Sequence, residues 1–325
     1  MSTSGEQTLP VVRVGEIESE PSGQRWLVEE LWGASSVGVI GGAPKCAKTW
    51  LGLDMALSVA TGTACLDKYA VPEPGPVLVY LAEDALPVMR ERIAGMARHR
   101  GLDLAGVDIH VITTPTLRLD RDPDRTRLLV TTKRLRPRLL LLDPLVRLHG
   151  IDENNAGEVA ALLAYFRSLQ RQLELSVLLV HHTRKNAAGG VAAGQGLRGS
   201  SDIHAFGDSN LYLRRTREHL VLSSEHRAAP ASPPVYLELV ATDAQTTHLE
   251  VIGELQDGSA KLTMDGKKRG LEERVLDLLG QGATVTRAKL RDSLGVKNER
   301  LGEALEALER AGRLCRTPAG WQRRN

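Results

Sequence analysis

The segment Gly42–Thr49 carries the clearest chemistry in this 325-residue chain. It follows the apolar run Val37–Ile40 and matches the pattern G-x-x-x-x-G-K-[ST], except that Ala47 stands where the second glycine is usual. In such a loop, backbone N–H groups and the N-terminus of the next helix hold the phosphates of a nucleoside triphosphate. The sequence therefore predicts a phosphate-binding loop between a strand and a helix. The alternative is a glycine-rich turn without a ligand.

The side chains of this loop have distinct expected roles, with ATP and Mg²⁺ as the expected cofactors. Lys48 is expected to reach the β- and γ-phosphate oxygens, and Thr49 is expected to offer its hydroxyl to Mg²⁺. The Ala47 methyl crowds the backbone where a phosphate must approach. The residues expected to contact the nucleotide are Gly42, Ala43, Pro44, Lys45, Cys46, Ala47, Lys48, Thr49 and Trp50.

Asp143 follows the run Leu139–Leu142, as in a Walker B element. A carboxylate at the end of a strand beside the phosphate loop can hold Mg²⁺ directly or through water. Asp143 is therefore a second expected metal ligand. The alternative is an Asp that caps the following turn, since Asp-Pro is also a turn signal.

Two further acids, Glu83 and Asp84, follow the apolar segment Val79–Leu81. Hydrolysis of a phosphoanhydride needs a carboxylate that orients and partly deprotonates the attacking water. Glu83 is the candidate for that role, while Asp84 fits the N-cap of the next helix. The alternative is that both acids only cap this helix.

His182 stands at the end of a third apolar segment, Leu178–Val180. A polar side chain there can touch the γ-phosphate and transmit its presence to the following loop, so His182 fits a sensor. The neighbouring His181 also suggests a metal site, but adjacent residues of a strand point to opposite faces. The sensor reading is therefore preferred to zinc.

These candidates lie at the ends of apolar runs that alternate with amphipathic segments, which is typical of βαβ units around a mostly parallel sheet. Strands are expected at 37–40, 77–81, 107–112, 139–142 and 177–180, and helices at 48–61, 84–100, 122–135 and 155–174. Later strand-like pieces at 209–214, 219–224, 234–241 and 247–253 are expected to extend the sheet. The fold class is α/β, with a tail at 1–20, a large domain at 21–256 and a linker at 257–270.

Residues 271–325 show a separate pattern of three short amphipathic helices followed by a hairpin. This order describes a winged helix-turn-helix. The candidates for contact with duplex DNA are Lys297, Asn298, Arg300 and Arg316. The alternative is a winged helix that binds a protein, since several glutamates dilute the positive charge.

Composition restricts the remaining classes of protein. The net charge is only +2, but basic residues outnumber acidic ones from Arg287 onward, which suggests a basic C-terminal face. Three cysteines without metal-ligand spacing fit a reducing compartment. No apolar run approaches the ~18 residues of a membrane span, so a cytoplasmic location is expected.

The set of motifs resembles the RecA-like P-loop ATPases of the hexameric RepA replicative-helicase group, and it implies classification among AAA-type ATPases. The resemblance covers about residues 25–255 and is carried by the strings GGAPKCAKTWLGLDMALSVATG, VYLAEDA, LLLLDPL, VLLVHHTRK and LRGSSDI. It implies a hexameric ring with ATP at the subunit interfaces. The winged-helix prediction is independent of it.

The resemblance also implies roles for residues outside the pocket motifs. Arg198 and Arg227 look like arginines that reach a neighbouring subunit's nucleotide, although Glu225 replaces the lysine usual two residues before Arg227; alternatively, either arginine is an ordinary surface residue. Segments 145–157 and 184–200 look like loops that face DNA in the ring channel. Their basic residues Arg147, Arg184 and Lys185 can meet phosphates.

The function that follows is an ATP-driven, ring-forming DNA motor of the replicative-helicase type. The first alternative is a nucleotide-switched DNA-binding regulator or loader, which the C-terminal module favours. The second is a nucleotide-binding scaffold with negligible turnover, motivated by Ala47.

Overall fold

The computed structural model describes residues 11–16, 26–153, 155–182, 201–216, 219–256, 259–261, 271–279, 284–294, 298–317 and 320–323. The chain divides into two compact units, Met1–Thr263 and Met264–Asn325. The first unit contains the phosphate loop and the second contains the basic C-terminal segment.

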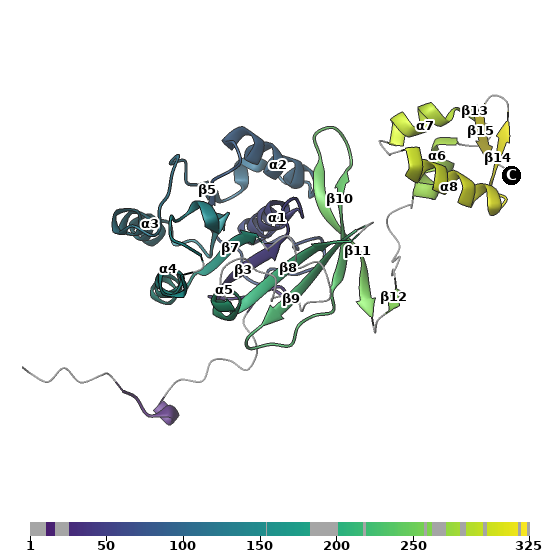
Figure 1. Ribbon diagram of the computed structural model, residues 1–325. Helices are drawn as coiled ribbons and strands as arrows, with labels where there is room; N and C mark the ends of the chain where they lie inside the picture. The colour runs from purple at the N-terminus through teal and green to yellow at the C-terminus, as the bar shows by residue number, and fades with distance from the viewer. Residues whose placement is uncertain are drawn as a thin grey trace, which may run out of the picture. The chain divides into compact units, whose positions relative to one another are not determined.

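A mostly parallel sheet runs through the first unit (Figure 1), with the strand order β12-β11-β10-β9-β8-β3-β7-β6-β4-β5. The strands from β3 to β8 that pair with one another are parallel. Their bounds are β3 Val37–Gly42, β4 Val77–Leu81, β5 Ile109–Val111, β6 Leu139–Asp143, β7 Ser176–His182 and β8 Ser209–Arg215.

The sheet continues beyond β8 by antiparallel pairing through β9 Leu220–His226, β10 Val235–Ala241, β11 Thr247–Gln256 and β12 Ser259–Lys261. A separate two-stranded ribbon is formed by β1 Trp26–Val28 and β2 Trp32–Gly33. The antiparallel extension follows from sequence, because short hairpin connections replace the long helical crossovers that parallel strands require.

Helices cover both faces of the parallel strands (Figure 1). They are α1 Lys48–Thr61, α2 Leu86–His99, α3 Asp122–Leu135, α4 Ala156–Leu173 and the short α5 Ser201–Phe206. Strand β6 has an apolar core on each face. Leu139 and Leu141 pack on one face with α1 and α2, whereas Leu140 and Leu142 pack on the other face with α3 and α4. A strand buried on both faces must be apolar throughout, which explains the continuous leucine run.

The carboxyl ends of the parallel strands meet at one edge of the sheet. Gly42 of β3 is opposite His182 of β7, and Leu81 of β4 is opposite Asp143 of β6. Strand β8 also ends at this edge, because Gly42 is opposite Leu213 on its other side. This register brings together motifs that are far apart in the sequence.

Two glycines allow β8 to lie against β3. A Cβ at Gly38 would lie 1.7 Å from the carbonyl oxygen of Ser209, and one at Gly42 would lie 2.5 Å from that of Leu213. Both distances are far below a van der Waals contact, so no other residue fits either position without movement of the backbone.

The second unit has its own apolar core, in which Val275, Leu290, Leu305 and Trp321 are buried. Its helices are α6 Leu271–Leu279, α7 Arg287–Leu294 and α8 Asn298–Arg310. Its strands β13 Thr284–Val285, β14 Leu314–Thr317 and β15 Gly320–Arg323 form a sheet in the order β13-β15-β14.

The structure places the predicted helices and strands close to their expected bounds. The expected strand at 107–112 is reduced to β5, and the helix expected from 84 begins at Leu86. Strands β1, β2, β12 and β13 were not predicted, because strands of two or three residues leave no period in a sequence. Strand β12 pairs with β11 inside the segment 257–270, which was expected to be a linker. None of the described helices combines the length and the apolar character needed to cross a bilayer.

Candidate nucleotide-binding site

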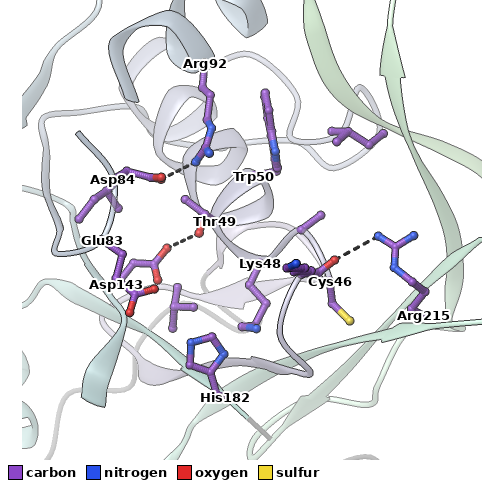
Figure 2. Close-up of a pocket in the computed structure, with 15 residues that line it drawn as sticks. Cys46, Lys48, Thr49, Trp50, Glu83, Asp84, Arg92, Asp143, His182 and Arg215 are labelled. Atoms are coloured by element: carbon purple, nitrogen blue, oxygen red, sulfur yellow. Dashed lines mark hydrogen bonds and ion pairs between the residues drawn. The ribbon is translucent and has the colours of Figure 1, made fainter. Parts of the chain in front are cut away.

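A cavity of about 310 Å³ lies at the carboxyl edge of the sheet (Figure 2). The predicted residues that line it come from the phosphate loop, the start of α1 and the ends of β4, β6 and β7. They are Lys45, Cys46, Ala47, Lys48, Thr49, Trp50, Glu83, Asp143 and His182. The fold thus brings residues from four separate motifs to one pocket.

The phosphate loop connects β3 to α1 through two residues with a left-handed backbone. Lys45 has φ 64°, and Ala47, the N-cap of α1, has φ 60° and ψ 25°. This conformation costs an alanine about 1 kcal/mol relative to glycine, which explains why glycine is usual at this position. The loop forms with alanine, so the departure from the pattern does not prevent the fold of the motif.

Lys48 is held inside the loop. Its side chain is buried, and Nζ donates hydrogen bonds to the carbonyl oxygens of Gly42 at 3.0 Å and Ala43 at 2.9 Å. Burial lowers the pKa of Lys48, while interactions with the side chains of Cys46, Asp143 and Glu83 act in the opposite direction. An ammonium group held by carbonyls at the floor of the loop is placed to meet an incoming phosphate.

Thr49 and Asp143 are joined by a hydrogen bond of 2.6 Å from Oγ1 to Oδ2. Asp143 is 7% exposed, and burial raises its pKa to about 6. The hydrogen bond from Thr49 and the charge of Lys48 lower that pKa, while the charges of Asp84 and Glu83 raise it further. A hydroxyl and a carboxylate oxygen at this separation fit the hard-oxygen donor set of Mg²⁺, whose other positions are usually filled by water and phosphate.

Glu83 lies on the wall of the pocket and is about half exposed. Its Oε1 accepts a hydrogen bond of 2.9 Å from Nε of Arg147. Figure 2 shows Glu83, Asp143 and Thr49 on one side of Lys48. The water-orienting candidate and the two metal-binding candidates therefore share one wall.

Asp84 does not cap α2. The N-cap of that helix is Ala85, which makes no side-chain cap, and Asp84 instead forms an ion pair with Arg92 of α2. The prediction of an Asp84 cap was therefore wrong. Arg92 lies eight residues further along the chain, and the ion pair with it takes the place of a local cap.

His182 lines the pocket at the end of β7, whereas its neighbour His181 is 2% exposed. The two imidazoles therefore have different surroundings, as the alternation of a strand requires. In the part of the chain that the structure describes, no three His, Cys, Asp or Glu side chains are placed to hold a metal ion together.

Three residues at the pocket had no signal in the sequence. Arg215, at the end of β8, donates from Nη2 to the carbonyl oxygen of Lys45 at 3.2 Å. Arg92 lies 5.3 Å from the centre of the Trp50 ring, and Leu239 of β10 completes the lining. Arg215 and Leu239 reach the site only through strand pairing, and Arg92 meets Asp84 across eight residues, so no local motif encodes any of these contacts.

Arg227 lies at the opposite edge of the sheet. Strand β9 is antiparallel to β8, so its end at His226 is opposite Ser209, at the start of β8. The seven residues of β8 span about 20 Å. Nη2 of Arg227 donates to the carbonyl oxygen of Ala205 at 2.8 Å, so the side chain is held at the edge remote from the pocket.

Three of the predicted nucleotide contacts, Gly42, Ala43 and Pro44, belong to the loop but are not among the residues that line the cavity. Arg147 pairs with Glu83, and Arg316 is exposed in β14. Arg184, Lys185, Arg198 and Lys297 lie outside the described residues, and only the backbone is described for Asn298 and Arg300 of α8.

A comparison with protein families identifies the core. The family model described as AAA domain matches residues 3–188, which contain the phosphate loop, Glu83, Asp143 and His182. The chain belongs to the AAA domain family. Within this AAA domain protein, the matched segment ends six residues beyond β7 in the sequence.

The same core is similar to solved structures. The match to a DnaB-like replicative helicase, whose structure was described together with its interactions with primase, covers 66% of this chain and 59% of the helicase chain. The identity is 13% and the TM-score is 0.52. The RadB recombinase is 16% identical over 64% of this chain and 88% of its own, with a TM-score of 0.46. A KaiC-like protein from Pyrococcus horikoshii OT3 is 12% identical over 69% of this chain and 93% of its own, with a TM-score of 0.48.

The similarity to the helicase is one of fold, and the AAA domain protein spans only 59% of the length of that helicase. Together with the family match, it confirms the predicted RecA-like P-loop ATPase core.

We expect Asp143→Asn to stabilise the nucleotide-free protein at about pH 8, and we expect this gain to decline as the pH falls below 6 and to be mostly lost by about pH 4. The folded-state pKa of about 6 exceeds the ordinary 3.8, so the wild-type carboxyl is mostly protonated at the lower pH and is a buried charge at the higher one. The gain at the higher pH should be on the order of 3 kcal/mol, measured as the free energy of unfolding in urea.

Asp120→Asn is the control of opposite sign. Burial opposes ionisation of Asp120 as well, but hydrogen bonds from Arg118 and Gly150 outweigh it and lower its pKa. Its stabilising effect is present above the unfolded-state pKa and is lost as the pH falls, so this variant should be destabilised at the higher pH. An effect of Asp143→Asn that does not depend on pH would contradict the buried-charge account.

We expect Ala47→Gly to tighten Mg–ATP binding while the free energy of unfolding changes by less than about 0.5 kcal/mol. Glycine removes the left-handed strain but adds comparable entropy to the unfolded chain, so the two effects offset. Calorimetric titration with ATP then reports the crowding by the methyl alone. Ala43→Gly, which removes a methyl from the same loop where φ is not positive, should leave the affinity unchanged.

Proposed function

We propose that this chain is an ATP-driven, ring-forming motor that acts on DNA, a RepA-like replicative helicase. The observation that carries the proposal is the convergence of Lys48, the hydrogen-bonded pair Thr49 and Asp143, and Glu83 on one pocket. This set supplies a phosphate ligand, a site for Mg²⁺ and a carboxylate for water, which are the parts that phosphoryl transfer to water requires.

In the proposed reaction, the loop N–H groups and Lys48 bind the phosphates of ATP. Mg²⁺ held by Thr49 and Asp143 would neutralise charge on the phosphate oxygens. Glu83 orients a water molecule and accepts its proton as the water oxygen attacks the γ-phosphorus and the bond to the ADP oxygen breaks. His182, at the end of β7, is placed to sense whether the γ-phosphate is present.

The position of Arg227 supports an active site shared between subunits. A cationic side chain about 20 Å from its own pocket can stabilise charge only in a neighbour's site, which a head-to-tail ring would provide. Arg198 is a second candidate for this role. We propose a hexamer with ATP at each interface.

The proposed contact with single-stranded DNA is mainly electrostatic. Arg147, Arg184 and Lys185 lie in segments that follow β6 and β7 at the nucleotide edge, and the chain contains only 3% aromatic residues for base stacking. Binding should therefore weaken steeply with salt.

The C-terminal unit favours a second candidate, a nucleotide-switched regulator or loader. Its order of elements, three helices and a hairpin with exposed Arg316 in β14, supports a winged helix-turn-helix. We propose that Asn298 and Arg300 of α8, together with Lys297, which precedes α8 in the sequence, meet duplex DNA in either candidate. A scaffold with negligible turnover remains the third candidate, and rapid hydrolysis that is lost in Lys48→Ala excludes it.

Mixing two inactive variants tests the shared site. Arg227→Ala and Glu83→Gln should each reduce ATP turnover by about two to four orders of magnitude. Rings assembled from equal amounts of both should recover about a quarter of wild-type turnover, because one interface in four pairs an intact Glu83 with an intact Arg227. Steady-state phosphate release from co-expressed proteins measures this.

No recovery in the mixture would mean that Arg227 does not act between subunits. Mixing Glu83→Gln with Lys48→Ala provides the control, because both changes fall in the same pocket and no interface regains a complete set.

Strand separation of a forked duplex distinguishes the motor from the regulator. We expect ATP- and Mg²⁺-dependent unwinding by the wild type and none by Glu83→Gln, since only hydrolysis drives movement. DNA-stimulated hydrolysis without unwinding, combined with a footprint on one duplex sequence that Arg316→Ala abolishes, would instead favour the regulator.

A further inference from the structure

The water-orienting candidate and a DNA-facing candidate form an ion pair with each other. Nε of Arg147 donates to Oε1 of Glu83 at 2.9 Å, although the two residues belong to different strand-end segments. Glu83 lines the nucleotide pocket, and Arg147 is not among the residues that line it. The pair therefore connects the pocket to the surface beside it.

Arg147 lies on a rigid segment. It ends the 3-10 helix Leu145–Arg147, which is fastened on both sides by the buried side chains of Leu145 and Leu148. Its backbone N–H donates to the carbonyl oxygen of Pro144 at 3.1 Å. Exchange of partners by Arg147 thus needs only a change of side-chain rotamer.

The pair is exposed enough to be exchanged. The Arg147 side chain is 62% exposed and that of Glu83 is 49% exposed. Exposed pairs of this kind shift an equilibrium by at most about fivefold, whereas an arginine meets a phosphate with a stronger, bidentate geometry. A chain of phosphates arriving at this surface can therefore take the guanidinium from the carboxylate.

We propose that Arg147 is a positioning residue for Glu83: its ion pair restrains the carboxylate until a phosphate of single-stranded nucleic acid takes the guanidinium, which frees Glu83 to orient water. This inference rests on the proposed function, because it assumes that the chain binds DNA and hydrolyses ATP. In this proposal, DNA binding is coupled to ATP hydrolysis by one change of partner, in which Arg147 leaves Glu83 for a phosphate.

Binding of a labelled single-stranded oligonucleotide, without ATP, tests the exchange independently of hydrolysis. Glu83→Ala frees Arg147 and should tighten binding by up to about fivefold. In the Arg147→Ala background the same change should have no effect. Fluorescence anisotropy on the four proteins of this double-mutant cycle measures the coupling.

Asp84→Ala is the matched control. It removes a carboxylate of the same charge at the next residue, but this carboxylate pairs with Arg92 and not with Arg147. Its effect on DNA affinity should be the same with and without Arg147. An equal gain from Glu83→Ala in both backgrounds, or no gain in either, would overturn the inference and leave the proposed function intact. Absence of oligonucleotide binding by every protein would overturn both.

Turnover provides a second readout. Arg147→Ala should raise kcat without DNA by up to about fivefold, leave KM for ATP unchanged and reduce the stimulation by DNA. Arg147→Lys, which keeps the cation, should retain most of the stimulation. A fall in DNA-free kcat with unchanged stimulation would show that Arg147 does not restrain Glu83.

Discussion

The hydrogen bond between Thr49 and Asp143 joins the first turn of α1 to the end of β6, although the two residues are 94 positions apart. It exists because parallel pairing through β7 holds β3 and β6 in the same layer. The carboxylate lies where burial raises its pKa to about 6, so the folded chain keeps an unfavourable charge near neutral pH. A bound cation would offset the cost of burying the ionised carboxyl, so a carboxyl with this raised pKa is suited to the proposed Mg²⁺ site.

The change of strand direction after β8 divides the functional residues into two groups. Strands β3, β4, β6 and β7 run the same way and deliver their following residues to one edge. Strand β9 runs back and delivers Arg227 to the other edge. One sheet thus presents a pocket on one edge and an arginine on the other, which is the arrangement that the proposed head-to-tail ring requires.

Two ion pairs in the core unit illustrate how burial separates structural from exchangeable interactions. Arg100 and Asp54 are 2.7 Å apart with side chains 5% and 2% exposed, and Arg100 also donates to Ser58. Removal of either partner would leave a buried charge, so this pair is permanent. Arg147 and Glu83 have a similar separation in a solvated setting, where water and phosphate compete for each partner.

The phosphate loop, the strand-end acids Glu83 and Asp143 and the succession of helices and strands can be predicted from neighbouring residues alone. Spacing and apolar periodicity are local properties, and the folded protein keeps them. Strand pairing and packing between separate elements bring Arg215 and Leu239 to the pocket, pair Asp84 with Arg92 and place Glu83 against Arg147. These contacts depend on strand order and on the direction of side chains from separate elements, and no short stretch of sequence encodes either.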